Sequence, residues 1–390
     1  MESTSIRLGK IAGIPVGISW SLLVIAALFS FGLAEGRFPG SDPGYASGTY
    51  WLAATVTVVA FFASILAHEL AHAVVARRHG LPVEGITLWL LGGIARMGAE
   101  PATPGAELRI AGVGPLSSAV VGVGFAGLAW TSDQLGIEPI VGSVFGWLAL
   151  INLALAVFNA VPASPLDGGR VLAAVVWWRT GDRTRGNVGA AHAGRILGGV
   201  LVAYGLWELI GQDSDLGIWT MLVGWYIWQS AGADGRSAQA RGALAGIPAV
   251  EAVRPDPPIV DESVTVDGLV AMLGHDGHHT AFVVREHDGV LRSVVTLDDI
   301  RRVPPGRRGE LTLHDIAVPI SQLTTAWATE PLLRVIERIP AEGRPEIVVY
   351  DDRMCLVGVV SRSDLARLAA ARQVPSSPRR PARRSGSAAS

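Results

Sequence analysis

The sequence has little charge, one cysteine and almost no lysine. Charged residues make up only 17% of the 390-residue chain and the net charge is −2, whereas a soluble protein usually has about 25% charged residues. This composition excludes a disordered chain, a basic nucleic-acid-binding protein and an ordinary cytosolic enzyme. The single cysteine, Cys355, excludes a disulfide scaffold and a cysteine-rich metal site. The single lysine, Lys10, indicates a base-composition bias of the genome rather than a mechanism.

The charge is distributed unevenly along the chain. The first 240 residues contain 28 charged side chains, whereas the remaining 150 contain 38. The second value is normal for a soluble domain and the first is far below it. The sequence therefore predicts a membrane-embedded part followed by a water-soluble part.

Six apolar runs have about the 20-residue length that crosses a bilayer. The predicted spans are residues 13–34, 52–76, 108–130, 141–163, 191–211 and 216–232. Arg7 and Lys10 precede the first run, as in a signal peptide, but this run is longer than a typical signal core and lacks a cleavage pattern of small residues. We therefore interpret it as a membrane anchor.

The basic residues of the loops predict the orientation, because cytoplasmic loops are enriched in lysine and arginine. The N-terminal segment and the loops 77–109 and 164–190 are basic, whereas the loops 131–140 and 212–215 contain no basic residue. This alternation predicts a cell-membrane protein with a cytoplasmic N-terminus and a cytoplasmic C-terminal half.

One motif of the second predicted span carries chemistry, the sequence His68-Glu69-Leu70-Ala71-His72. Residues four apart share a helix face, so both imidazoles can bind one metal ion. Glu69 lies beside them and could take a proton from a zinc-activated water. Three ionisable side chains in one turn of a membrane helix are costly to bury, which favours a functional site over a hydrated helix end.

A catalytic zinc site needs a third protein ligand and an open fourth position. Cys355 lies in the soluble part, so a carboxylate or histidine of another span is required. Asp167 is the best candidate because it follows a proline-rich break in the fourth span, where irregular backbone can line a cavity. Its alternative role is a helix N-cap. Asn159 could donate to a developing oxyanion or form an interhelical hydrogen bond.

These two motifs, residues 68–72 and 159–169, together resemble the site-2 protease family of intramembrane zinc metalloproteases. The resemblance implies an active site within the membrane, toward its cytoplasmic side. It assigns zinc binding to His68, His72 and Asp167, general-base catalysis to Glu69, and substrate or oxyanion contact to Asn159.

Two further stretches resemble features of the same family. Residues 112–115, Gly-Val-Gly-Pro, resemble its glycine-proline motif, which packs near the metal helix. Residues 85–97 resemble its membrane-associated β-hairpin, and apolar residues alternate at Ile86, Leu88 and Leu90. An edge strand at 86–90 could hold an unwound substrate by strand addition; a re-entrant or surface loop is the alternative.

The soluble half contains a weak repeat, because residues 293–300 and 358–365 each follow an apolar strand and a turn. This resembles a pair of CBS modules, predicted at 246–305 and 306–371, after a linker at 236–245 and before a disordered basic tail at 372–390. The resemblance implies an adenine nucleotide near four side chains, Thr296, Asp299, Ser361 and Asp364. A pair used only for dimerisation or docking is the alternative, and Ser293 stands where the first repeat usually has glycine.

The expected fold is a multi-pass α-helical membrane protein with six transmembrane helices (residues 1–235) and a small membrane-associated β-hairpin, followed by a soluble α/β CBS pair. The expected function is intramembrane zinc proteolysis of a membrane-tethered regulator, for example an anti-sigma-type protein. Membrane lipid and a CBS-mediated homodimer are further expected partners, and nucleic acid is not. The alternatives are a CBS-regulated transporter or channel, and an inactive protein that binds membrane clients.

Overall fold

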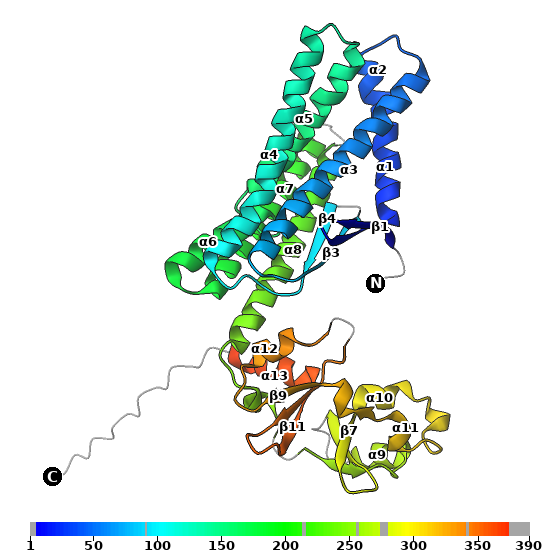
Figure 1. The fold of residues 1–390 in the computed structure, drawn as a ribbon, viewed down its shortest axis with the longest axis vertical. Helices are drawn as coiled ribbons and strands as arrows, with labels where there is room; N and C mark the ends of the chain where they lie inside the picture. Colours follow the sequence, from blue (N-terminus) through cyan, green and yellow to red (C-terminus); the bar gives the residue numbers. More distant parts are fainter. Residues whose placement is uncertain are drawn as a thin grey trace, which may run out of the picture. The chain divides into compact units, whose positions relative to one another are not determined.

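The computed structural model describes the chain except for residues 1–4, 90–91, 213–215, 255–256, 274–279, 341–342 and 374–390. It divides into two compact units, Met1–Ala238 and Gln239–Ser390, shown in Figure 1. Most of the predicted tail, residues 374–390, lies outside the described residues. Its first two residues belong to the last helix, α13 (Arg362–Gln373).

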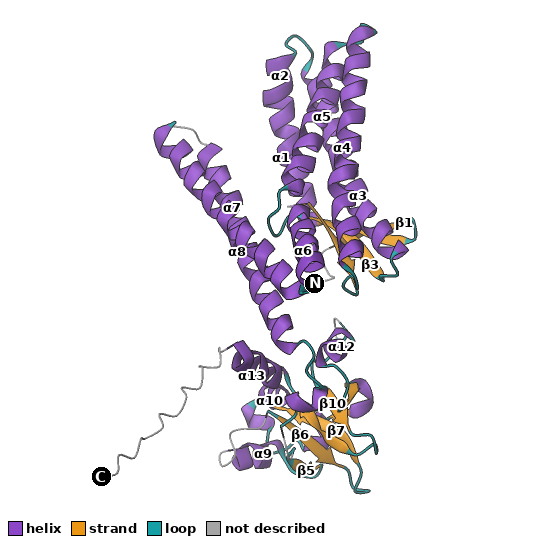
Figure 2. Cartoon of the chain, turned by 90° about the vertical axis from the view of Figure 1, so that its left-hand side faces the viewer, coloured by secondary structure: helices purple, strands orange, loops and turns teal. Residues whose placement is uncertain are grey.

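Long apolar helices dominate the first unit (Figure 2). Five helical segments of the described chain are long and apolar enough to cross a membrane. They are α1–α2 (Trp20–Gly32 and Phe38–Ser41, joined by a π-helical turn, Leu33–Arg37), α3 (Ser47–Arg78), α4 (Pro104–Gln134), α5 (Pro139–Ala160) and α7 (Arg183–Gly211). The shorter α6 (Asp167–Thr180) lies between α5 and α7. The sixth predicted span lies in α8 (Leu216–Leu244), a long helix that is not among these five.

Two predicted span boundaries are wrong. The first helix begins at Trp20 rather than at residue 13, because residues 14–19 form a strand and the Ser19 hydroxyl accepts a hydrogen bond from the Ser21 amide (3.4 Å) at the helix start. The helix of the fourth span ends at Ala160, because prolines 162 and 165 have no amide hydrogen to continue it.

A four-stranded sheet lies beside the ends of α1 and α3 (Figure 1). Its order is β1 (Ser5–Ile11), β2 (Ile14–Ser19), β3 (Val83–Trp89) and β4 (Gly92–Met97), with only β2 and β3 parallel. The predicted hairpin is confirmed as β3–β4. The expectation of an edge strand at 86–90 is wrong, because β2 pairs with β3 on its other side; Leu90 itself is not described. The edge strands of the sheet are β4, within the hairpin, and β1, on the opposite side.

The sheet has one buried and one open face. Ile14, Ile86 and Leu88 are buried in a core that they share with apolar residues of α1, α3 and α5. The alternating residues Pro15, Gly17, Gly85 and Thr87 lie on the other face. The sheet is thereby fixed to α3, the helix that carries the His-Glu-Leu-Ala-His motif.

The second unit contains two similar α/β halves. The first has β5–β8 (Ile259–Asp261, Ala281–Arg285, Leu291–Thr296, Val318–Pro319) with α9 (Val266–Leu273), α10 (Leu297–Arg302) and α11 (Leu313–Ile316). The second has β9–β11 (Thr324–Trp327, Ile347–Tyr350, Leu356–Val360) with α12 (Leu332–Glu337) and α13. The two repeats occupy equivalent places, each forming a strand followed by a helix. Most of the predicted linker, residues 236–244, lies in α8.

Candidate metal centre

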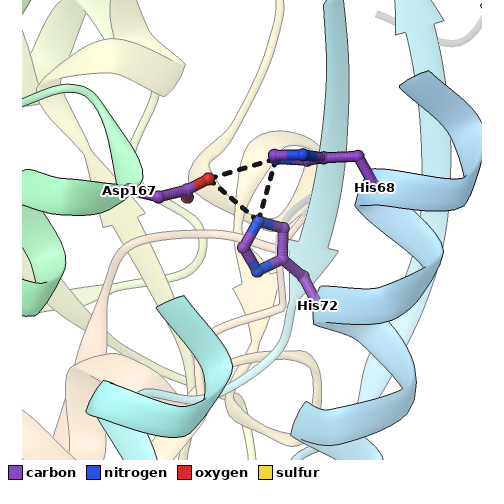
Figure 3. Close-up of side chains that lie close together, drawn as sticks. All are labelled: His68, His72 and Asp167. Atoms are coloured by element: carbon purple, nitrogen blue, oxygen red, sulfur yellow. Dashed lines mark hydrogen bonds and ion pairs between the residues drawn. The ribbon is translucent and has the colours of Figure 1, made fainter. Parts of the chain in front are cut away.

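Three side chains from two helices converge on one point (Figure 3). His68 and His72 lie one turn apart on α3, and Asp167 is the first residue of α6. The Oδ2 atom of Asp167 lies 3.1 Å from the Nε2 atom of each histidine, and the two Nε2 atoms are 3.2 Å apart. Both imidazoles are buried and the carboxylate is nearly so. The structure thus brings together all three predicted metal ligands.

The other ring nitrogens hold the imidazoles in place. The Nδ1 atom of His72 donates to the carbonyl oxygen of Ile110 (2.6 Å), and the Nδ1 atom of His68 lies 2.9 Å from the Ser118 hydroxyl. An imidazole that donates through Nδ1 presents a lone pair at Nε2, the arrangement usual for metal-binding histidines. Both contacts come from α4, so this helix sets the direction in which each imidazole presents its Nε2 atom.

The donor set fits zinc. Two imidazole nitrogens and one carboxylate oxygen are the ligands of many catalytic zinc sites, with bonds of about 2.0–2.1 Å. Tetrahedral angles at such bonds place neighbouring ligand atoms roughly 3.3 Å apart, and the observed separations are 3.1–3.2 Å. Three lone-pair donors this close repel one another unless a cation or a proton lies between them.

Close backbone packing positions Asp167. A Cβ atom on Gly168 would lie 2.3 Å from the carbonyl oxygen of Val161, and one on Gly169 would lie 2.5 Å from the Ala163 backbone. The preceding loop is also tied to the last helices, because the Ser164 amide donates to the Ala190 carbonyl (3.0 Å) and its hydroxyl to the Asp234 carboxylate. Asp167 begins the helix and Leu166 occupies the N-cap position, so the N-cap alternative fails.

Gly114 of α4 lies directly against the imidazoles. A Cβ atom at this position would be 2.2 Å from His72 Nε2 and 2.7 Å from His68 Nε2. Two residues earlier, a Cβ on Gly112 would meet nothing within 4 Å. Gly114 is therefore the residue of the glycine-proline motif that allows α4 to approach the predicted metal ligands.

Glu69 is half-buried on α3 next to the ligands, and strand β4 passes beside it. A Cβ atom on Gly93 would lie 2.2 Å from the Glu69 Cγ atom and 3.0 Å from its Oε1 atom. Edge strand β4 thus runs within contact distance of the predicted general base.

Asn159 is not brought into the ligand cluster. Its Nδ2 atom donates to the Leu155 carbonyl oxygen (3.1 Å), one turn earlier on the same helix. This contact matches neither the predicted oxyanion contact nor the interhelical alternative. An amide has two N–H groups, so one of them remains for another acceptor.

The four predicted nucleotide-binding side chains cap helices of the second unit. Thr296 and Asp299 form a capping box at the start of α10, and Ser361 forms the same side-chain and backbone hydrogen bonds with Asp364 before α13. Both carboxylates are buried and also form ion pairs, Asp299 with Arg344 (2.8 Å) and Asp364 with Arg254 (2.9 Å).

Four contributors to the metal centre escaped sequence reasoning. Ser118 carried a usable signal, because it lies four residues after Gly114 and so shares its helix face. The Ile110 carbonyl, Gly93 and Asp234 carried none, since a backbone acceptor, a strand glycine and a remote carboxylate reach the centre only through tertiary packing.

The chain matches two family models and several known proteins. The model of peptidase family M50 matches residues 56–134 and 132–201, and that of the CBS domain matches residues 249–306. Rip3 of Mycobacterium tuberculosis, named as a zinc metalloprotease, is 39% identical over 93% of this chain and 92% of its own length. A protein of Synechocystis with a similar name is 32% identical over 94% of this chain and 95% of its own length.

A solved structure of a site-2 protease from Methanocaldococcus jannaschii is 28% identical, with a TM-score of 0.41 over 59% of this chain and 95% of that one. The two curated relatives match nearly the whole chain, CBS region included. The chain therefore belongs to peptidase family M50, the site-2 protease family, and is a membrane-embedded zinc metalloprotease with a C-terminal CBS region.

Proposed function

We propose that this protease hydrolyses peptide bonds in or near the transmembrane segment of membrane-tethered regulatory proteins, with anti-sigma-type regulators as one substrate class. The observation that carries the proposal is the convergence of His68, His72 and Asp167 at 3.1–3.2 Å within a unit of membrane-length apolar helices. In this proposal the three side chains hold zinc, which supplies Lewis-acid activation of water.

Glu69 is the general base of the proposed reaction. Its carboxylate accepts a proton from the attacking water and returns it to the peptide nitrogen, which must be protonated before it leaves as an amine. Asn159 is the proposed oxyanion contact, through the N–H group that is not bonded to Leu155. Its role requires the substrate carbonyl to lie near the end of α5.

The edge strand β4 is the proposed substrate-binding element. Backbone hydrogen bonds shield the peptide bonds of a transmembrane helix, so a substrate must unwind locally before water attacks. An edge strand offers unpaired backbone groups to an extended chain. Because Gly93 of β4 contacts Glu69, a substrate segment added to this strand would lie beside the general base.

We propose an orientation with the N-terminus and the CBS region in the cytoplasm and the metal centre toward the cytoplasmic side. The support is the basic composition of the N-terminal segment and of the loops 77–109 and 164–190. The proposed domains are residues 1–235 for the protease and 246–305 and 306–371 for the CBS modules.

We propose that the CBS pair regulates the protease by binding an adenine nucleotide near Thr296, Asp299, Ser361 and Asp364. Arg344 and Arg254 already pair with the two aspartates, so a ribose hydroxyl that bonds to either carboxylate must displace or share an arginine. Dimerisation through the CBS modules is the second proposed role of this region.

The test compares the purified full-length wild type with Glu69→Gln. Both should bind one equivalent of zinc, and only the wild type should cleave a membrane-tethered substrate. Equal cleavage by the two proteins would overturn the role of Glu69. Zinc binding without cleavage by either protein would favour an inactive client-binding protein, and absence of zinc from both would favour a transporter or channel.

A further inference from the structure

The open face of the β1–β4 sheet contains a hollow of about 470 Å³. Residues of the inner strands β2 and β3 line it between the two edges, Gly17 and Gly85 among them. Three cationic side chains line it, Arg7 and Lys10 from edge strand β1 and Arg96 from edge strand β4. The hollow therefore has positive charge on two opposite sides.

The strand register explains this arrangement. One row across the sheet runs from Lys10 through Pro15 and Gly85 to Arg96. The next row runs from Arg7 through Gly17 and Thr87 to Ile94. Side chains at the ends of each row are long and those in the middle are short or absent. Three strand spacings of about 4.8 Å separate the edges, so cations from both sides can reach one ligand over the centre.

The three cations have no counter-ion in the described part of the chain. Among the ion pairs of the described residues, none includes Arg7, Lys10 or Arg96, and all three side chains are exposed. The one carboxylate that lines the hollow belongs to Glu84. The lining thus carries a formal charge of +2 around a neutral centre, which is complementary to an anion.

The surroundings favour a lipid over a peptide as the source of this anion. Strand β2 leads directly into the apolar helix α1, whose first residue, Trp20, is 57% exposed. Ile94, in the row nearer α1, is 49% exposed on the same face. Arg7 ends that row at the opposite edge, and the other two cations, Lys10 and Arg96, lie in the row farther from α1. Exposed apolar groups on the membrane side, with two of the three cations beyond them, match the order of groups in a phospholipid at a bilayer surface.

An extended peptide fits this face less well. Peptides bind sheets mainly through unpaired backbone groups at an edge, and the backbone groups of the inner strands β2 and β3 are already paired on both sides. Phosphate oxygens need only the charged side chains that surround the hollow.

From these observations we infer that the hollow binds the headgroup of an anionic phospholipid, with its phosphate between Arg7, Lys10 and Arg96. Glu84 refines the choice of headgroup. Its carboxylate accepts hydrogen bonds from hydroxyl groups and repels extra negative charge, which favours a hydroxyl-bearing phosphodiester such as phosphatidylglycerol over phosphatidic acid. The Thr87 hydroxyl provides a further donor on the same face.

The test titrates phosphatidylglycerol into the full-length protein in detergent and counts bound lipid by native mass spectrometry. The triple variant Arg7→Gln, Lys10→Gln and Arg96→Gln should bind on the order of 100-fold more weakly than the wild type. The matched control replaces three exposed arginines outside the hollow, Arg78, Arg179 and Arg236, with glutamine. It should bind as the wild type does, and equal loss in both triple variants would overturn the site.

Further variants and competing ligands in the same assay identify the ligand. Arg96→Glu alone should abolish the tight binding and serves if the triple variant does not fold, which its thermal unfolding will show. Glu84→Gln should reduce the preference for phosphatidylglycerol over phosphatidic acid. Displacement of the lipid by millimolar inorganic phosphate would overturn the assignment to a lipid headgroup. Binding of the zwitterionic lipid phosphatidylcholine as tightly as phosphatidylglycerol would overturn it as well.

Discussion

Replacement of Gly114 by alanine should weaken zinc binding by this protease without unfolding it. The added Cβ atom would lie 2.2 Å from His72 Nε2, 2.5 Å from its Cε1 atom and 2.7 Å from His68 Nε2. Because atoms in ordinary contact are about 3.5 Å apart, the His72 ring must move by roughly 1.3 Å. Metal sites keep their geometry only within about 0.5 Å. We expect zinc affinity to fall at least 10–100-fold, or about 1.4–2.7 kcal/mol.

Gly112→Ala is the matched control, because its Cβ atom meets nothing within 4 Å on the same helix. Both substitutions improve helix propensity by roughly 0.5–1 kcal/mol, so neither should lower stability through the backbone. Zinc content by mass spectrometry, zinc affinity against a competing chelator, and thermal unfolding of both variants provide the assay. Wild-type zinc affinity in Gly114→Ala would refute the derived position of α4 against the histidines.

Three further predictions concern other parts of the chain. Ile94→Pro and Ala95→Pro test strand addition to β4. Only one of these two residues has a backbone N–H that faces away from β3, and proline at that residue should abolish cleavage with zinc retained, whereas Ile94→Ala should be tolerated. Cleavage by both proline variants would exclude strand addition to β4. Asp234→Asn should weaken zinc binding several-fold, because its carboxylate holds the Ser164 hydroxyl three residues before Asp167, and a chelator titration showing unchanged affinity would contradict this. Burial raises the pKa of the Glu346 carboxyl, whose Oε2 atom has no hydrogen-bond partner among the described residues. Ionisation therefore destabilises the folded state as pH rises through this raised pKa. Glu346→Gln should therefore raise the unfolding temperature at neutral pH and give no gain below about pH 4, and a gain independent of pH would exclude ionisation as its cause.

The chemistry of the metal centre was predictable where it depends on local periodicity. His68 and His72 are four residues apart, and a helix places such residues on one face whatever surrounds them. The long apolar runs likewise require a membrane, because their length and lack of charge leave no other solvent for them. The two CBS halves were visible because each repeats the same strand, turn and helix within a short stretch.

Several boundaries and strand positions were not predictable from local pattern. Residues 14–19 are as apolar as a helix start, and their pairing with β1 and β3 makes them a strand. That pairing also places β3 inside the sheet and leaves β4 as the edge strand of the hairpin. The sequence of a hairpin does not specify which of its two strands pairs with a third strand. Asn159 shows the same limit, since its donor bonds within its own helix rather than to the centre.

The sequence by itself determined that this chain is a membrane protein with a two-histidine motif, a nearby candidate general base and a soluble repeat, because each of these depends on residues close together in the chain. Only the tertiary structure decided which atoms converge at the candidate metal centre. Asp167 meets His68 across 99 positions of sequence, and Ser118 and the Ile110 carbonyl fix the imidazoles from a third helix. The physical reason is that metal coordination and hydrogen bonding require contact within about 3 Å, a separation that packing of distant helices sets and local pattern cannot.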